Sequence, residues 1–278
     1  ARLTVYADNS PDEGKQLGTS FVSDVLGINY GTEKIDQIRA MLPGLKMLTS
    51  EHTNATVARG EFARELAQVE RIRKNLDILE ARPWMAGSAL WGMHDYGTDY
   101  WPVWPEQHSG VLDSTRLPKL SFSYLQARWS AAPVLHIAAA SGKAAVLSNC
   151  ERVELFLDGR SLGARAKQNP AMWELPAASG ILRAVCPGAS VETRLPGPAA
   201  ALRLEARPAR IVADAADAAE ITVRVVDANG VTAPISGAAE LELEGPGVLR
   251  GIGGWPRVKL AAGAGRIVVQ STAQPGMI

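Results

Sequence analysis

The feature that most constrains the fold is a change in sequence pattern close to residue 130. Thirteen of the sixteen Phe, Trp and Tyr residues precede this point, whereas Ala, Val, Leu and Gly dominate the remainder of the 278-residue chain. Before it, short apolar runs alternate with helical segments, and after it, short strand-like runs are separated by turn residues. The pattern therefore predicts two kinds of module, within a length that suits two or three domains of about 100 residues.

The first part is predicted to alternate buried strands with helices. Residues 60–80 carry apolar side chains at steps of three and four with charged residues between them, which is typical of a helix with one buried face. A second helix is predicted over 33–42. The alternation of strands and helices along the chain favours parallel strands joined by helices, although four strands are too few to close an eight-stranded barrel. The predicted strands are 2–7, 24–29, 46–50 and 86–92.

The part after residue 130 is predicted to form two β-sandwich modules. Short alternating strands are separated by turns such as Asp158-Gly159, and a Pro196-Gly197-Pro198 linker divides the two sets. The last module is expected to stop at Ile278 without a closing turn. The predicted domains are 1–130 for the α/β part, 131–195 for the first sandwich and 196–278 for the second.

Charge and composition exclude several classes of partner. Lys plus Arg and Asp plus Glu both number 29, whereas a nucleic-acid or anionic-membrane partner normally requires a basic excess. No apolar run approaches the roughly 18 residues of a membrane span. The two cysteines, Cys150 and Cys186, exclude a disulfide framework and a multi-cysteine metal site, and leave one disulfide or two buried thiols as equal alternatives.

Polar side chains follow two of the predicted strands. Glu51 comes directly after the strand 46–50, at the end of the strand where catalytic groups lie in β/α folds. It could act as a nucleophile, base or metal ligand, or merely cap the next helix. Asn29 and Tyr30 end another strand, and a tyrosine hydroxyl close to a carboxylate can keep it ionised and oriented. The alternative is a packed tyrosine with its hydroxyl at the surface.

An aromatic loop follows the fourth predicted strand, which Trp91 ends. Aromatic rings beside polar groups suit a sugar, because its apolar faces stack on rings while its hydroxyls form hydrogen bonds. The alternative is that several of these rings pack at a domain interface. No metal-ligand spacing and no GxGxxG after a strand is present, so neither a metal nor a cofactor is predicted. The loop residues are His94, Asp95, Tyr96, Tyr100, Trp101 and Trp104.

These segments together resemble the C-terminal half of glycoside hydrolase family two enzymes, closest to the bacterial β-galactosidase-like members. The resemblance rests on DVLGINYG, LTSEHTNATVARGEF, PWMAGSALWGMHDYG and HSGVLDSTRLPKLSFSYLQARW, in the family's order and spacing. VLSNCERVELFLDGRSLG and ITVRVVDANGVTAPIS with GPGVLRGIGG extend it over nearly the whole chain. It implies an α/β plus all-β fold, in which about four strands of a (β/α)8 TIM barrel precede two immunoglobulin-like β-sandwich domains.

The resemblance also implies a retaining exo-β-glycosidase acting on a β-linked sugar. Glu51 matches the nucleophile and Tyr30 the tyrosine beside it, so both are assigned to catalysis. No Asn-x-Lys pair that would hold a uronic acid lies between Trp91 and Lys119, so a neutral sugar, most plainly a galactoside, is expected. The substrate-binding residues that the resemblance implies are Asn29, His52, Trp91, Asp95 and Tyr96.

The chain departs from the family in one respect that bears on activity. The family's acid/base glutamate lies in an Asn-Glu pair, and no such pair occurs in this sequence. Loss of a general acid costs roughly 10²–10⁴ in rate. The chain alone is therefore expected to be inactive, with the N-terminal half of the barrel supplied in cis or in trans. A non-catalytic carbohydrate-binding or scaffolding remnant is the alternative, and an adhesion array a weaker one. A periplasmic or secreted location is favoured over a cytoplasmic one.

Overall fold

The computed structural model describes residues 2–98, 106–166, 168–251 and 257–278. The chain forms two compact units. One comprises Ala1–Val57 and Leu66–Val111, and the other Ala58–Glu65 and Leu112–Ile278. No helix among the described residues is long and apolar enough to span a membrane. The three predicted domains, 1–130, 131–195 and 196–278, stay a prediction.

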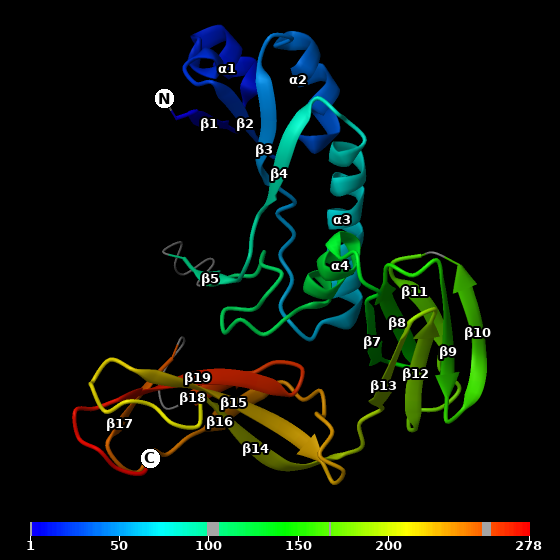
Figure 1. Ribbon diagram of the computed structural model, residues 1–278, viewed down its shortest axis with the longest axis vertical. Coiled ribbons are helices and arrows are strands. Elements are labelled where there is room, and N and C mark those ends of the chain that lie inside the picture. The colour runs from blue at the N-terminus through cyan, green and yellow to red at the C-terminus, as the bar shows by residue number, and fades with distance from the viewer. Residues whose placement is uncertain (1, 99–105, 167, 252–256) are drawn as a thin grey trace. The chain divides into compact units, whose positions relative to one another are not determined.

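The first unit is built around a parallel four-stranded sheet in the order β1-β2-β3-β4 (Figure 1). All four predicted strands are present, with ends shifted by one to three residues at most positions. Trp91 lies directly after β4 rather than inside it. The strands are β1 (Val5–Asp8), β2 (Val25–Asn29), β3 (Lys46–His52) and β4 (Met85–Leu90), with the short pair β5 (Tyr96–Gly97) and β6 (Glu106–Gln107) beyond them.

Helices connect these strands, as the alternating pattern predicts. The apolar stripe of the longest helix is buried, since Val69, Ile72, Leu76 and Leu79 are each 3% exposed or less. The expectation that every strand is buried is wrong for β1 and β4, whose residues are mostly exposed. Each pairs on one side only among the described residues. The helices are α1 (Pro11–Leu17), η1 (Thr19–Phe21), η2 (Thr32–Lys34), α2 (Ile35–Met41), α3 (Phe62–Glu80) and α4 (Leu120–Trp129).

Two facing sheets follow α4 in the second unit (Figure 1). Alternate residues of β9 and β12 are buried, and their inward side chains Leu155, Leu182 and Ala184 meet Val146 and Trp173 of the other sheet. A disulfide joins Cys150 to Cys186 within this core. The strands are β7 (Leu135–Ala140), β8 (Lys143–Ser148) and β11 (Ala171–Glu174) in one sheet, and β9 (Arg152–Leu157), β10 (Arg160–Ala166), β12 (Ile181–Cys186) and β13 (Ala189–Arg194) in the other.

A second pair of sheets ends the chain. Val223, Leu249 and Ile267 of the larger sheet pack with Val258 and Leu260 of the smaller one. The chain is therefore mostly sheet with few helices, as expected, whereas closure into an eight-stranded barrel stays a prediction. The strands are β14 (Ala199–Arg207), β15 (Ala218–Asp227), β17 (Gly247–Arg250) and β19 (Ala264–Ser271), with β16 (Gly237–Glu240) paired to β18 (Arg257–Leu260).

Candidate active site

The adjacent carboxyl ends of β2 and β3 bring Tyr30 and Glu51 together. Ile28 pairs with Thr49 and Asn29 with Glu51, so Ser50 is one extra residue in β3, a local bulge. The Tyr30 backbone N–H donates to the Glu51 carbonyl oxygen at 2.7 Å. Tyr30 has a left-handed φ of 58°, which turns the chain sharply as it leaves the strand. The bulge and the turn thus fix both residues at one edge of the sheet.

The side chains of Tyr30 and Glu51 are also paired. The Tyr30 phenol lies near the Glu51 carboxylate, and the two side chains interact. Burial is the largest of the effects that raise the pKa of Tyr30, followed by the interaction of its hydroxyl with Glu51 and by the negative charge of Glu51. The phenol therefore stays protonated near neutral pH and remains a donor. A half-buried carboxylate held in this way is oriented for attack on an electrophile.

Asn29 is held beside this pair. The Ser50 hydroxyl donates to Asn29 Oδ1 at 2.6 Å, which leaves the amide nitrogen as a potential donor to a sugar hydroxyl. Asn29 also lines a cleft of about 270 Å³, together with Asn9, Lys34 and Gln37. A small cleft that combines amide, ammonium and apolar groups is typical of a site for a small polar ligand.

His52 lies within the sheet rather than at its surface. Its side chain is 1% exposed, and burial lowers its pKa to about 4, so the imidazole is neutral near pH 7. Its Nδ1 lies 2.7 Å from Thr53 Oγ1, which also accepts a hydrogen bond from Asn75 Nδ2 at 2.6 Å. These contacts fix the loop that follows Glu51. A direct contact of His52 with sugar stays a prediction.

Trp91 and Tyr96 form an aromatic pair just beyond β4. The Trp91 backbone N–H donates to the His52 carbonyl oxygen at 2.9 Å, and the peptide bond between Trp91 and Gly92 is cis. The rings of Trp91 and Tyr96 meet edge to face, with centroids 5.8 Å apart and planes at 83°. Both rings are half-buried. Tyr100, Trp101 and Trp104 lie outside the described residues.

Asp95 is buried and anchors the loop that returns toward the sheet. Its Oδ1 accepts the Gly110 N–H at 2.9 Å, and its Oδ2 lies 3.1 Å from His108 Nδ1. A Cβ at Gly110 would stand within 2.5 Å of the His94 and Asp95 backbone, so only glycine fits there. The observed contacts of Asp95 are therefore with protein groups, and its contact with a sugar stays a prediction.

One cluster of possible metal ligands in the same loop was not predicted from the sequence. Asp95, Glu106 and His108 each present one ligand atom, and these atoms lie within 4.8 Å of one another. His108 Nε2 is 3.7 Å from the nearest oxygen of Glu106. Carboxylate and imidazole groups of this kind could hold a metal ion. The Glu-x-His spacing was the available signal, because alternate residues of an extended chain share one face.

Two family models match the chain. One, described as glycoside hydrolase family 2 C-terminal domain 5, matches residues 202–278, and the other, a domain of unknown function (DUF4982), matches residues 144–190. The chain is 23% identical, over 96% of its length, to the beta-galactosidase BoGH2A of Bacteroides ovatus. It is 30% identical, over 61% of its length, to a beta-glucuronidase of Formosa agariphila. It spans 38% and 20% of the lengths of these relatives.

Solved structures share the fold across nearly the whole chain. A beta-glycosidase from Bacteroides vulgatus superimposes with a TM-score of 0.79 at 18% identity, over 98% of this chain and 48% of its own. A glycosyl hydrolase family 2 member from Bacteroides cellulosilyticus gives a TM-score of 0.75 at 23% identity, over 99% of this chain and 41% of its own. The family model for residues 202–278 and the beta-galactosidase relative support a C-terminal fragment of a glycoside hydrolase family 2 protein, and the solved structures share its fold.

Proposed function

We propose that this chain is the C-terminal portion of a retaining exo-β-glycosidase with Glu51 as its nucleophile. The observation that carries the proposal is the carboxylate–phenol pair of Glu51 and Tyr30 at the carboxyl ends of parallel strands. A retaining glycosidase needs a carboxylate beside the anomeric carbon, and the Tyr30 phenol lies near this one.

The reaction proceeds in two displacements. A Glu51 oxygen attacks the anomeric carbon, the bond to the aglycone oxygen breaks, and a glycosyl-enzyme ester forms. The acid glutamate donates its proton to the leaving oxygen and then takes one from water, which attacks the same carbon and releases Glu51. The two carboxyl groups of such enzymes lie roughly 5 Å apart. The Trp91 and Tyr96 rings offer an apolar surface to the sugar, and Asn29 offers a donor to a hydroxyl.

The acid glutamate comes from an N-terminal half of the barrel, in cis or in trans. The exposure of β1 and β4 supports this part of the proposal, because unpaired strand edges with exposed apolar side chains are sites for further strands. Val5 and Tyr6 of β1 are 52% and 38% exposed, and four residues of β4 are exposed. Added strands along both edges would pair with the edge backbone groups of β1 and β4.

The substrate is a β-galactoside in this proposal. The absence of an Asn-x-Lys pair between Trp91 and Lys119 argues for a neutral sugar, and the relative that matches 96% of the chain is named a beta-galactosidase. A β-glucuronide is the second candidate, since the Formosa agariphila relative named a beta-glucuronidase is 30% identical over a shorter span.

A substrate comparison on the complete enzyme tests the proposal. We expect kcat/KM for nitrophenyl β-galactoside to exceed that for the β-glucuronide by about tenfold or more, because without an Asn-x-Lys pair to hold it the uronate charge is poorly paired in the site. NMR should detect the β-anomer of the sugar as the first product. Faster hydrolysis of the β-glucuronide would make the second candidate the substrate. Formation of the α-anomer as the first product would refute retention. Inactivity on all β-glycosides would favour a non-catalytic remnant.

A further inference from the structure

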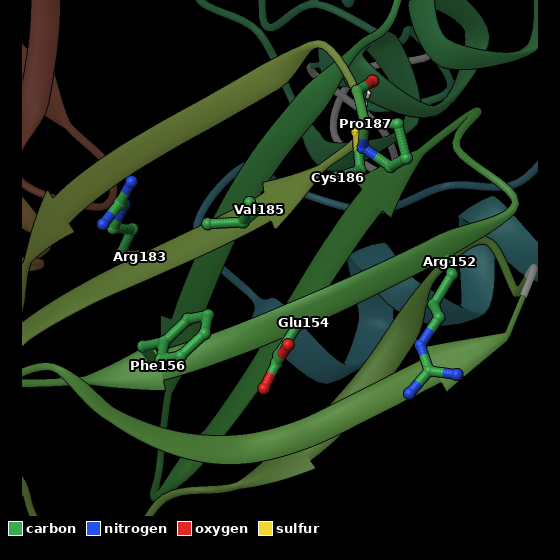
Figure 2. A pocket seen from close by; sticks show the side chains of 7 residues that line it. All are labelled: Arg152, Glu154, Phe156, Arg183, Val185, Cys186 and Pro187. Atoms are coloured by element: carbon green, nitrogen blue, oxygen red, sulfur yellow. Dashed lines mark hydrogen bonds between the residues drawn. The ribbon is translucent and has the colours of Figure 1, made fainter.

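A hollow of about 490 Å³ lies on the outer face of the sheet β10-β9-β12-β13. It belongs to the segment that matches a domain of unknown function. Figure 2 shows Arg152, Glu154 and Phe156 in a row along β9, with Arg183 and Val185 on the neighbouring β12. Cys186 and Pro187 complete the lining at one end. We call it the Phe156 hollow.

Strand alternation explains why an aromatic ring stands on this face. Val153, Leu155 and Leu157 of β9 point into the core, so the residues between them face outward. On β10 the residue opposite Phe156 is Ser161, and Ala164 stands opposite Glu154. Because both of these neighbours are small, β10 does not cover the Phe156 ring. The result is a shallow hollow with an aromatic side chain in its lining.

Phe156 is unusual among the described residues after residue 130. Trp173 is the other aromatic side chain there, and it is 3% exposed in the core. Phe156 is half-buried and reaches the surface in the hollow. An aromatic face edged by polar groups is the arrangement that stacks on the C–H face of a sugar ring while its hydroxyls are bound.

The charged groups around Phe156 specify the kind of sugar. Arg183, directly opposite Phe156, donates to Ser190 Oγ at 3.1 Å and lies 3.7 Å from Glu192. Glu154 accepts a hydrogen bond from Ser161 Oγ at 2.5 Å. The Arg152 side chain, by contrast, forms no ion pair or hydrogen bond with any residue that the structure describes. Its guanidinium is therefore available to donate two parallel hydrogen bonds to a carboxylate, as a bidentate pair.

We propose that the Phe156 hollow is an accessory binding site for an acidic sugar unit of a polysaccharide. One sugar ring of the polysaccharide stacks on Phe156, the carboxylate of another unit along it pairs with Arg152, and Glu154, which lies between them on β9, accepts a hydrogen bond from a ring hydroxyl. No bond is made or broken at this site. The site is independent of Glu51, so its failure would leave the proposed catalytic function untouched.

Calorimetric titration of the 278-residue chain tests the proposal. The probes are the α-1,4-linked trimer of galacturonic acid and the galactose trimer of the same linkage, which differ in the carboxylate alone. We expect the acidic trimer to bind about tenfold more tightly, with affinity falling as salt increases, because the ion pair is exposed and screened. Phe156→Ala and Arg152→Ala should each weaken its binding about tenfold. Arg203→Ala on the exposed face of β14 is the matched control and should change nothing.

Three outcomes would overturn the proposal. Equal affinity for the two trimers would show that the site does not recognise the carboxylate. Unchanged binding by both Phe156→Ala and Arg152→Ala would place any binding elsewhere. Failure of the unaltered chain to bind either trimer would leave the hollow without a sugar ligand. Thermal melting of each variant identifies loss of fold, and Arg152→Ala, which alters an exposed side chain, keeps the test decisive if Phe156→Ala is unstable.

Discussion

Glu51→Gln in the complete enzyme is expected to lower kcat on the order of 10³-fold or more. An amide oxygen is a poor nucleophile and cannot form the glycosyl ester, so the two-step route closes. The change is nearly isosteric, and the Tyr30 hydroxyl can still donate to the amide oxygen. Folding should therefore be preserved. The measurement is steady-state hydrolysis of a nitrophenyl β-galactoside, with circular dichroism as the check on folding.

The matched control for this variant is Glu174→Gln. It removes the same charge from an exposed position of β11, where the side chain is 78% exposed and pairs with Lys143 at 3.5 Å. Exposed ion pairs of this kind contribute little, so both activity and melting should match the unaltered enzyme. Retention of more than about 10% of kcat by Glu51→Gln would contradict the assignment, because loss of a true nucleophile leaves far less.

Reduction of the Cys150–Cys186 disulfide is expected to lower the free energy of unfolding by about 4 kcal/mol. The two cysteines are 36 residues apart, and opening a loop of that length increases the entropy of the unfolded chain, which stabilises the unfolded state by about this free energy. The bond links the segment before β9 to the end of β12, so its loss acts on the first sandwich. The measurement is denaturant unfolding of the 278-residue chain with and without a phosphine reductant, with thiol counting by mass spectrometry.

Cys150→Ala combined with Cys186→Ala provides the control. This variant should unfold at a lower denaturant concentration than the unaltered, oxidised chain under both conditions, and its unfolding curve should not change with the reductant. An unchanged unfolding curve for the unaltered chain after complete reduction would contradict the prediction.

Strong local patterns made much of the fold predictable from sequence. The stripe of α3 and the alternation in β9 and β12 each reflect one buried face, so they can be recognised from neighbouring residues alone. α1 and α4 were missed for the opposite reason. The segment PDEGKQL of α1 lacks an apolar stripe, and α4 buries Ser121 and Ser123 beside its apolar residues. Burial of these serines depends on tertiary packing that a local pattern does not record.

The candidate site was predictable to a similar degree. Adjacent ends of parallel strands placed Tyr30 beside Glu51, and the structure joins them by a backbone hydrogen bond and brings the phenol near the carboxylate. The contacts of Asp95 could not be foreseen, because they depend on how residues 108–110 fold back against the loop. The spacing of Cys150 and Cys186 likewise left pairing open, since only the sandwich brings them to a Cα separation of 6.3 Å.

The most direct test of the central claim is covalent labelling of the nucleophile. The complete enzyme is treated with a 2-deoxy-2-fluoro-β-galactoside carrying a good leaving group, which slows hydrolysis of the glycosyl-enzyme and lets it accumulate. Peptide mass spectrometry then locates the sugar. We expect one fluorosugar per active site, attached to the peptide that contains Glu51, and none on Glu51→Gln. A label on any other carboxylate, with Glu51 unmodified, would contradict the account.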